Sequence, residues 1–546
     1  MVKDRMSFSA LGGLGEIGLN CYLYNIFNDK VSEYLMVDLG MGFKDGALTS
    51  IETFYPDVRF MEQLKQEIKG LLITHGHEDH IGAIAHLWQF IECPIYATAF
   101  TADLIREKLK EYHLDGKVNI IVVDKNKYYK IGKFEVKWLT IHHSIPDSNI
   151  IVMKTPLGNI VHSGDFKLNY GDHLILKDLP QIKNEKIEYL FCDSTNVLEE
   201  GRSGDDLLTK PSLKELIQNA PAIAWITLFS SNLERIAIIC EIAKETNKKI
   251  VLLGRSLDTY VGLGIKHKIV NDFTFISIEE AKHMKPNQLI YLVTGSQGED
   301  RSTLHNVIFN AGYKYKLGEK DIVIFSSRVI PGNEQKLTKY YNKLASMDTT
   351  YYTSDHYKIH VSGHPKKEEL KDLYKMVEPN YIVPMHGDIM HLKAHSSLAY
   401  SLGYNSFNCL NGNIIELFTA EPTLIGQWDT GKLCEEGHRL ISANEDFLRV
   451  RTKIFYEGTV FVSLNIIFGK NIVPKISFLG LLTLDEEKTH NDYLCEKLKS
   501  YLISTLQEME MSEEELSEKV RIFVRKYCKD RLDKKPIVQV HVHVID

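Results

Sequence analysis

Apolar and polar residues follow two different spacings along the chain. Short apolar runs bounded by polar turns predict strands at residues 20–27, 34–38 and 71–73. In the middle of the chain such runs predict strands at 250–253, 289–293 and 322–325, and apolar residues at helical spacing predict helices at 212–219 and 233–246. Strands that alternate with helices favour a parallel sheet, so the pattern indicates an α/β fold.

The last hundred residues show a mixed pattern that predicts a small α+β domain. We expect strands near 451–468, a helix at 493–509, and a second helix opened by a capping box at 512–515. The apolar stripe of that second helix comprises Leu516, Val520, Phe523, Val524 and Tyr527. A stripe of this kind usually packs within its own domain. Residues 426–450, between this region and the rest, look like a linker.

The chain ends in a strict apolar alternation at 536–544. This spacing predicts a strand that carries His541 and His543 on its polar face. A metal site is the alternative interpretation, but no third ligand lies nearby in the sequence.

A glycine motif near the start has two interpretations. Gly13, Gly15 and Gly18 match G-x-G-x-x-G, and Asp38 follows where a dinucleotide-binding fingerprint has an acid. That fingerprint requires a helix that begins at the glycines, so that its N-terminus faces the pyrophosphate. Here a strand, a turn and another strand follow, which argues against a dinucleotide site.

The segment 71–82 carries the strongest chemical signal. An apolar strand ends, a polar loop supplies His75, His77, Asp79 and His80, and residues 81–88 read as a helix. Imidazole and carboxylate groups are good ligands for zinc or manganese, and one strand-to-helix loop can serve two neighbouring ions. A solvated loop that merely contains histidines is the alternative, but the H-x-H-x-D-H order favours metal binding.

Composition narrows the class of protein. The 546 residues fit three or four domains, and 65 Lys and Arg against 72 Asp and Glu give a net charge of −7. This balance argues against a histone-like or tail-driven nucleic-acid binder, although a local basic stripe would still bind phosphates. Eight scattered cysteines without a C-x-x-C pair suit reduced thiols, and no apolar run is long enough for a signal or a membrane span. We therefore expect a cytoplasmic protein without membrane contact.

The metal-binding loop resembles the signature of the metallo-β-lactamase fold, and further motifs of that family follow in order. These are Asp38 after an early strand, His143 within 142–147, and Asp165 within 162–167. Three later segments resemble the β-CASP motifs: 192–196, 360–364 and 383–388. Segments 12–20, 294–299 and 325–334 resemble bacterial ribonuclease J, whereas Asp300-Arg301 and the stretch after 465 depart from its pattern.

The resemblance implies an αββα metallo-β-lactamase domain with an inserted α/β β-CASP domain and a small α+β C-terminal domain. The implied limits are 1–207 and 365–425 for the lactamase domain, 208–364 for the β-CASP domain, 426–450 for a linker, and 451–546 for a C-terminal domain that supports oligomerisation.

The resemblance also implies two divalent ions per chain. Zn²⁺ is the expected metal, and Mn²⁺ or Mg²⁺ are the alternatives. His75, His77 and His143 would hold one ion, Asp79, His80 and His386 the other, and Asp165 would bridge them. His142 stays an alternative to His143 because the two are adjacent.

The resemblance assigns catalytic roles to Asp79, Asp38, Asp193 and His364. Asp38 would orient a ligand or the attacking water. His364 would protonate the leaving oxygen, with Asp193 orienting its imidazole; the alternative is that His364 only caps a turn. Small hydroxyl and backbone donors would form a pocket for a 5′-monophosphate, comprising Ser231, Asn232, His360, Ser362, Gly363 and His364.

The implied function is a metal-dependent ribonuclease that degrades single-stranded RNA from 5′-monophosphorylated ends, with internal cleavage also permitted. Its implied assembly is a homodimer, a homotetramer or part of an RNA-degradation complex. Two alternatives remain within enzymes, a β-CASP nuclease acting on DNA and a small-molecule hydrolase. A third, of another class, is an inactive RNA-binding subunit. The intact ligand set argues against that third alternative.

Overall fold

The computed structural model describes residues 3–43, 51–168, 182, 184–271, 273–330, 332–437, 439–467, 471–508 and 511–545. Two compact units divide the chain, and the boundary lies between Leu433 and Cys434. The largest sheets of the first unit have eight, seven and five strands, and the second unit holds a three-stranded sheet. The predicted mixed α/β class is confirmed.

Two sheets face each other in the first unit. Their inner faces enclose one apolar core, in which Phe8, Tyr24, Trp138 and Phe191 are fully buried. The first sheet, in spatial order, comprises β24 (Thr423–Gln427), β23 (Asn413–Leu417), β1 (Arg5–Gly12), β3 (Cys21–Phe27), β4 (Ser32–Val37), β7 (Ile68–Leu72), β8 (Ile95–Ala97) and β9 (Ile120–Val122). The second comprises β10 (Tyr129–Ile131), β11 (Phe134–Thr140), β12 (Asn149–Lys154), β13 (Asn159–His162), β14 (Ile187–Asp193), β20 (Tyr381–Met385) and β22 (Asn405–Ser406).

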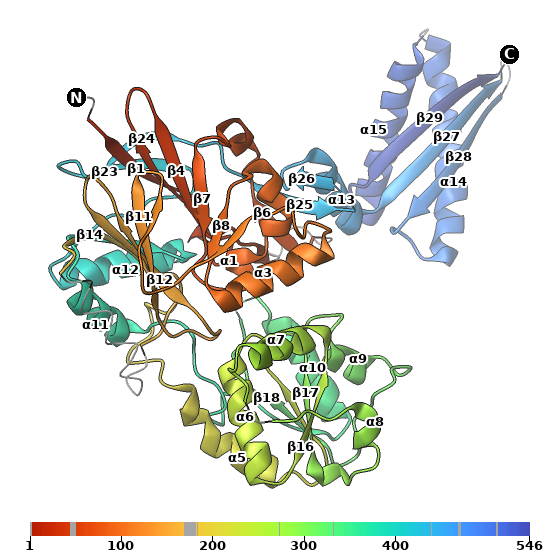
Figure 1. Cartoon of the computed structure of the whole chain (residues 1–546). Coiled ribbons are helices and arrows are strands. Elements are labelled where there is room, and N and C mark those ends of the chain that lie inside the picture. The colour runs from red at the N-terminus through yellow and green to blue at the C-terminus, as the bar shows by residue number, and fades with distance from the viewer. Residues whose placement is uncertain are drawn as a thin grey trace. The chain divides into compact units, whose positions relative to one another are not determined.

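Helices cover the outer face of each sheet, which completes an αββα arrangement (Figure 1). Helix α3 (Ala99–Glu111) contacts β8 and β9 of the first sheet. Helices α11 (Lys367–Val377) and α12 (Ile389–Ser401) share an apolar core with the second sheet. Because β20, β22, β23 and β24 come from the last part of the first unit, the chain returns to these sheets after an insertion.

The insertion is built on a parallel sheet. Its strands, in spatial order, are β16 (Lys249–Leu253), β17 (Leu289–Val293), β15 (Ala224–Thr227), β18 (Ile322–Phe325) and β19 (Thr350–Tyr352). Its helices are α5 (Lys210–Gln218), α6 (Leu233–Glu245), α7 (Arg255–Lys266), α8 (Ile278–Ala281), α9 (Thr303–Phe309) and α10 (Glu334–Ser346). The predicted strands and helices of this region are confirmed. They could be predicted because strands covered on both faces read as continuous apolar runs.

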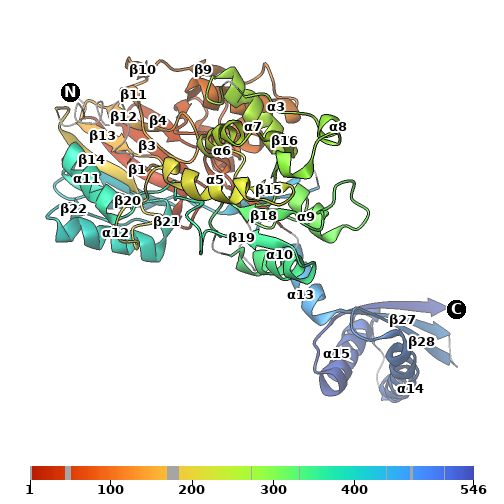
Figure 2. The same cartoon turned by 90° about the horizontal axis from the view of Figure 1, so that it is seen from below.

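The C-terminal unit pairs three strands with two long helices. Strand β27 (Thr459–Ile467) lies between antiparallel β28 (Asn471–Leu479) and parallel β29 (Ile537–Ile545). Helices α14 (Leu484–Glu508) and α15 (Glu513–Leu532) cover one face of this sheet (Figure 2). The predicted capping box at Ser512 is present, whereas Met509, the expected end of the first helix, lies outside the described residues. On β29 the side chains of His541 and His543 are exposed, as the alternation predicts.

One prediction near this unit is wrong. Residues 451–457 form the end of helix α13 (Asp446–Glu457) and not a strand. The many aromatic and β-branched residues of this segment suggested a strand, but Gly458, with φ +69°, ends a helix there. The segment 426–450, which the sequence suggests is a linker, contains strands β25 (Lys432–Glu436) and β26 (Arg439–Ser442) and the start of α13.

The predicted helix at 81–88 is interrupted. Short helix α1 (Glu78–Ile81) and short helix α2 (Ile84–Leu87) are separated by two residues. The Asp79 carbonyl accepts hydrogen bonds from Asn20, and the Ala83 amide donates to the loop after β4 instead of to its own helix. These contacts fasten the ligand-bearing loop to its neighbours.

The glycine motif does not open a helix. Gly13, Gly15 and Gly18 all have positive φ, and β3 follows them. The Gly13 carbonyl accepts a hydrogen bond from the His386 amide at 2.9 Å. The loop therefore supports a candidate metal ligand instead of a dinucleotide.

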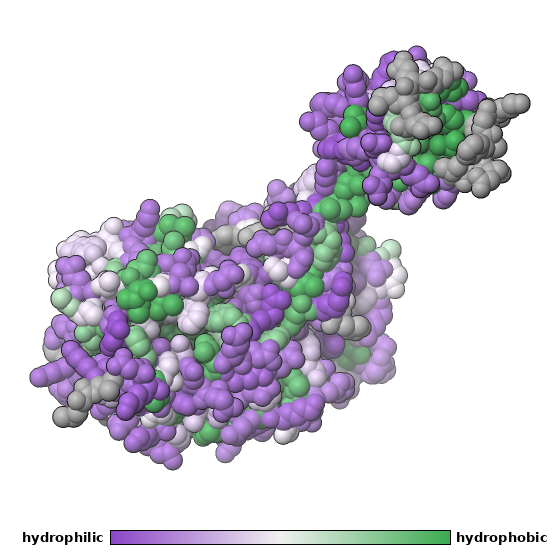
Figure 3. Space-filling view, turned by 90° about the horizontal axis from the view of Figure 1, so that it is seen from above, coloured by the Kyte–Doolittle hydropathy of each residue, from purple (hydrophilic) through white to green (hydrophobic). Residues whose placement is uncertain are grey.

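Throughout the described ranges, no helix combines the length and the apolar character that crossing a bilayer requires. On the face seen in Figure 3 hydrophilic residues dominate, and hydrophobic residues lie among them in small patches.

Candidate metal centre

The candidate ligands follow strand ends that share one edge of the two sheets. Strands β13, β14 and β20 are parallel neighbours; Asp165 follows the first, Asp193 ends the second and His386 follows the third. Strands β4 and β7 are also parallel, and Asp38 and His75 follow them. Because the carboxyl ends of parallel strands meet at one edge, residues far apart in the sequence lie together there.

Three histidines form the first donor group. Nδ1 of His77 lies 3.2 Å from Nε2 of His75 and 3.0 Å from Nε2 of His143. Ligand nitrogens around a tetrahedral zinc ion are separated by about 3.3 Å, because each lies about 2.0–2.1 Å from the metal. The three nitrogens therefore converge as ligands of one ion would, and the group takes in His143 and not its neighbour His142.

The second donor group contains two histidines and two carboxylates. Oδ2 of Asp79 lies 3.2 Å from Nε2 of His386, and Oδ2 of Asp165 lies 3.2 Å from Nε2 of His80. The same Asp165 oxygen is 3.9 Å from Nε2 of His75 and 3.8 Å from Nε2 of His143. One carboxylate oxygen therefore faces both groups.

Asp38 lies behind the second group and fixes its geometry. Its buried carboxylate accepts hydrogen bonds from Nδ1 of His80 at 2.7 Å and from the Thr74 amide at 2.9 Å and hydroxyl at 2.7 Å. With Nδ1 held in this way, Nε2 of His80 is the nitrogen that can bind a metal, and the Asn20 side-chain amide lies 3.0 Å from it. The neighbouring Gly40 must be a glycine, because a Cβ there would lie 1.6 Å from the Asp79 carbonyl oxygen.

We expect Asp38→Ala to weaken metal affinity by about 10–100-fold, because loss of a partner that orients a metal-ligating histidine has effects of this size. Competition with a fluorescent chelator measures this affinity. Asp29→Ala, which removes an exposed carboxylate from the turn before β4, is the control. Equal affinities in the two variants would contradict the orienting role of Asp38.

Hydrogen bonds to Nδ1 orient two further candidate ligands, His143 and His386. Nδ1 of His143 donates to the Gly363 carbonyl at 2.7 Å. Nδ1 of His386 lies 2.8 Å from the Thr195 hydroxyl, which itself donates to Asp193. Each of these bonds selects the tautomer in which Nε2 is unprotonated.

The charge states suit divalent cations. Burial and the neighbouring histidines lower the pKa of His75 and His143 well below the ordinary value, and burial lowers the pKa of His77 to about 4. Burial alone would raise the pKa of Asp165, but the nearby histidines outweigh it and the net pKa is lowered. Burial lowers the pKa of His386, but Asp165 and other carboxylates outweigh it and raise the pKa to about 10. Burial also lowers the pKa of His80, but the neighbouring carboxylates outweigh it and raise the pKa well above the ordinary value. Neutral imidazoles and ionised carboxylates are the donors that zinc and manganese prefer, so metal binding would release the protons of His80 and His386.

A third cluster adjoins these groups. Nδ1 of His364 donates to Oδ2 of Asp193 at 2.8 Å, and the imidazole stacks against His386 with ring centroids 5.6 Å apart. Burial lowers the pKa of His364, but Asp193 and Asp165 outweigh it, so the pKa is raised. Among the described residues no protein group bonds to Nε2, which leaves that nitrogen for a substrate.

Of the residues predicted to bind phosphate, Ser231 and Gly363 contact the first donor group and Ser362 contacts His364. The Ser231 hydroxyl is 3.1 Å from Nε2 of His77. The Ser362 hydroxyl accepts a hydrogen bond from Asn196 at 2.7 Å. Gly363 has no room for a side chain, because a Cβ would lie 2.6 Å from the Ser144 hydroxyl.

Asn232 and His360 make other contacts. The Asn232 side chain caps α6 by accepting from the Arg235 amide. Burial and Arg235 lower the pKa of His360 to about 3, and its Nδ1 has no hydrogen-bond partner within the part of the chain described. Neither side chain forms a hydrogen bond with a candidate metal ligand in the described structure.

A buried ionic network beneath the site was not predicted. Asp206 pairs with Lys167 and Arg235, and all three side chains are almost completely buried. Arg235 also donates to the Ile359 carbonyl at 2.7 Å. Lys167 lies two residues after Asp165, so the network joins the bridging loop to the insertion. Thr74 and Thr195 were also missed as partners of ligands, although each lies within a segment singled out in the sequence, 71–82 and 192–196.

Family models match most of the chain. Residues 14–222 match the metallo-beta-lactamase superfamily and 223–344 match the beta-CASP domain of ribonuclease J. Residues 355–408 match the RNA specificity domain of Zn-dependent metallo-hydrolases, and 446–545 match the ribonuclease J C-terminal domain. Together with the donor groups, these matches define a metallo-hydrolase of the metallo-β-lactamase superfamily with a β-CASP insertion.

Whole-chain relatives identify the family. The chain is 31% identical to a ribonuclease J of Sinorhizobium meliloti over 99% of this chain and 97% of the relative. It is 30% identical to one from Thermus thermophilus over 89% of this chain and 86% of the relative. The chain belongs to the ribonuclease J family, and the predicted class, a metal-dependent ribonuclease, is confirmed.

A solved structure also resembles the fold. A crystal structure of a protein of unknown function from Enterococcus faecalis V583 aligns with a TM-score of 0.54 at 14% identity. The alignment covers 76% of this chain and all of the other, and at this identity it supports the fold alone.

Proposed function

We propose that this protein hydrolyses single-stranded RNA in the 5′-to-3′ direction from 5′-monophosphorylated ends, and that it also cuts internally. The observation that carries the proposal is the 3.1 Å contact between the Ser231 hydroxyl and the candidate ligand His77. Hydroxyl and backbone donors that bind a terminal phosphate would then hold the first phosphodiester close to the metal centre.

The donor groups support two divalent ions, with Zn²⁺ first and Mn²⁺ or Mg²⁺ as alternatives. Divalent ions held there would supply an activated water as the nucleophile and would neutralise charge on the phosphate. His75, His77 and His143 would hold one ion and Asp79, His80 and His386 the other. Asp165 would help to hold both ions, because its Oδ2 faces both groups. Asp38 would keep His80 in the required tautomer.

His364 would donate a proton to the leaving 3′-oxygen. Its Nδ1 is occupied by Asp193, so Nε2 is the nitrogen that can reach a substrate. The ionised Asp193 favours the protonated imidazole, which is the form that a general acid requires.

One assay tests the proposal as a whole. The protein is incubated with 5′-monophosphorylated, 5′-triphosphorylated and circular RNA and with matched single-stranded DNA, in Mn²⁺ or Mg²⁺ and with a chelator. We expect the monophosphorylated RNA to be degraded fastest, slower cutting of circular RNA, and no activity with chelator. Cleavage that resists the chelator would contradict the metal mechanism, and a preference for DNA would favour the alternative nuclease.

The phosphate pocket has its own test. We expect Ser362→Ala to reduce the preference for monophosphorylated over triphosphorylated RNA by roughly tenfold, because a lost charge-assisted hydrogen bond weakens binding by about 1.5 kcal/mol. The ratio of kcat/KM for the two RNAs measures the preference. Ser397→Ala, on the exposed side of α12, should leave the ratio unchanged. An unchanged ratio in Ser362→Ala would remove this residue from the pocket.

Three further features belong to this proposal. The proposed domain limits are those expected from the sequence. They are 1–207 and 365–425 for the lactamase domain, 208–364 for the β-CASP domain, 426–450 for the linker and 451–546 for the C-terminal domain. The protein acts in the cytoplasm, which its eight free cysteines support. It assembles as a dimer or tetramer, alone or in an RNA-degradation complex, and analytical ultracentrifugation tests the assembly.

A further inference from the structure

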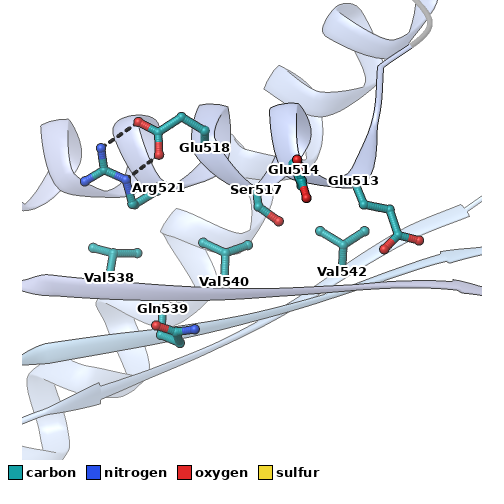
Figure 4. Close-up of a pocket in the computed structure, with 9 residues that line it drawn as sticks. All are labelled: Glu513, Glu514, Ser517, Glu518, Arg521, Val538, Gln539, Val540 and Val542. Carbon is teal, nitrogen blue, oxygen red and sulfur yellow. Dashed lines mark hydrogen bonds and ion pairs between the residues drawn. The ribbon is translucent and has the colours of Figure 1, made fainter.

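Helix α15 borders a hollow on each of its two sides. The first lies between α15 and β29 and is shown in Figure 4. Val538, Val540 and Val542 point from β29 toward the helix, and Glu518 pairs with Arg521. Glu513 and Glu514 also border this hollow, so its open charge is negative. It would repel a polyanion, and we assign it no ligand.

The second hollow, the α14–α15 groove, has the opposite character. It has a volume of about 540 Å³ and lies between the outer sides of the two helices. Four aromatic side chains line it, namely Tyr493, Tyr501, Phe523 and Tyr527. Four cations line it as well, namely Lys497, Lys519, Lys526 and Arg531, and Asp530 is the one acidic residue in the lining.

The aromatic side chains that line the groove are only partly buried in the apolar core of this unit. Of the apolar stripe predicted on α15, Leu516, Val520 and Val524 are buried, whereas Phe523 and Tyr527 are half-buried and border the groove. Phe523 stacks on Tyr501 with ring centroids 4.6 Å apart. Tyr493 is 43% exposed. Exposed aromatic rings offer flat apolar surfaces on which nucleobases stack, whatever the base.

The cations of the groove are not neutralised. Among the described residues none of the four has a carboxylate within ion-pair distance, although on the same helix Arg521 pairs with Glu518 and Lys529 pairs with Asp533. Lys497 and Arg531 both approach the Tyr493 ring, each 5.6 Å from its centroid. The groove therefore combines stacking surfaces with unpaired positive charge.

We propose that the α14–α15 groove is a second binding site for single-stranded RNA, separate from the metal centre and insensitive to sequence. Bases would stack at Tyr493 and beside the Tyr501–Phe523 pair, while Lys497, Lys526 and Arg531 neutralise phosphates. This inference rests on RNA as the substrate, as proposed above. An RNA long enough to occupy both sites gains affinity from the second contact, and a short one does not.

The test compares two full-length triple variants. The groove variant carries Tyr493→Leu, Lys497→Gln and Lys526→Gln. The control variant carries Phe461→Leu, Arg521→Gln and Lys529→Gln, which remove one exposed ring and two charges from the same unit outside the groove. Affinity for 30-nucleotide and 5-nucleotide RNA is measured in a His77→Ala background, and cleavage of the 5-nucleotide RNA is measured without that substitution.

We expect the groove variant to bind the long RNA about tenfold more weakly than the control variant, because stacking and phosphate contacts are lost together. The slope of log affinity against log salt should become shallower by about 1.4, or 0.7 for each of two lost phosphate contacts. Affinity for the 5-nucleotide RNA and its kcat/KM should be unchanged. Equal affinity of the two variants for the 30-nucleotide RNA would overturn the inference. It would also be overturned if the groove variant lost as much affinity for the 5-nucleotide RNA as for the 30-nucleotide RNA.

Two further outcomes distinguish this inference from a protein interface at the groove and from the proposed function. If the groove variant changes the sedimentation coefficient and leaves long-RNA affinity intact, the groove is a protein interface and the inference is wrong. If the unsubstituted protein binds RNA through the groove but does not cleave it, the proposed function fails and the inference stands.

Discussion

His77→Ala should reduce RNA hydrolysis by about 10³-fold or more and lower the amount of bound metal. His77 is the central donor of the first group, because its Nδ1 lies within 3.2 Å of Nε2 of both His75 and His143. Removing a residue that merely orients a ligand costs about 10–100-fold, so removing a direct ligand should cost more. Initial rates on 5′-monophosphorylated RNA with saturating Mn²⁺ measure activity, and plasma mass spectrometry measures metal per chain.

His541→Ala is the matched control. It removes an imidazole from the exposed face of β29, where the side chain makes no contribution to the donor groups. Activity and metal content should equal those of the unsubstituted protein. A tenfold loss of activity corresponds to only about 1.4 kcal/mol of transition-state stabilisation. If His77→Ala keeps more than about a tenth of the activity, the proposed role of His77 as a metal ligand is therefore wrong.

The donors of the metal centre could be predicted because several are adjacent in the sequence. Four of them lie within residues 75–80, and such a cluster has few other physical explanations. His143, Asp165 and His386 are isolated in the sequence, and only the resemblance to a family assigned them. The choice between His142 and His143 depends on which side chain points inward, which neighbouring sequence positions do not reveal.

The partners of these donors could not be predicted with the same ease. Thr74 and Thr195 each link a histidine to a buried carboxylate. A single threonine has no sequence pattern from which this role could be predicted. The pairing of Asp206 with Lys167 and Arg235 joins residues 39 and 29 positions apart. Contacts of this kind depend on how the insertion packs on the lactamase sheets, and the sequence pattern of each segment alone does not contain that information.

Local sequence patterns failed where tertiary contacts decide the backbone. The break between α1 and α2 arises because Asn20 takes the Asp79 carbonyl, although the apolar pattern is continuous. Helix α13 is rich in aromatic and β-branched residues, which favour strands, but a helix places Leu448 in a buried position. The strands of the parallel sheet were found correctly because burial on both faces makes them apolar throughout.

His364→Ala should lower kcat by about 10²–10⁴-fold, the usual contribution of a general acid, without loss of bound metal. The reason is that Asp193 holds Nδ1 of His364 at 2.8 Å, leaving Nε2 to protonate the leaving oxygen. Asp165, Asp193, His364 and His386 could also hold an ion of their own, because their donor atoms lie within 4.8 Å of one another. If His364 is instead a ligand, its removal should lower the metal content as His77→Ala does.

A modified substrate separates proton donation from every structural role. In RNA with a sulfur atom in place of the leaving 3′-oxygen, the departing thiolate needs no proton, because its pKa is far lower than that of an alcohol. We expect His364→Ala to cleave this RNA within about tenfold of the unsubstituted rate, since the contribution of the acid is then no longer required. His77→Ala should stay inactive on the same RNA. An equal defect of His364→Ala on the oxygen and sulfur substrates would show that the residue positions other groups and donates no proton.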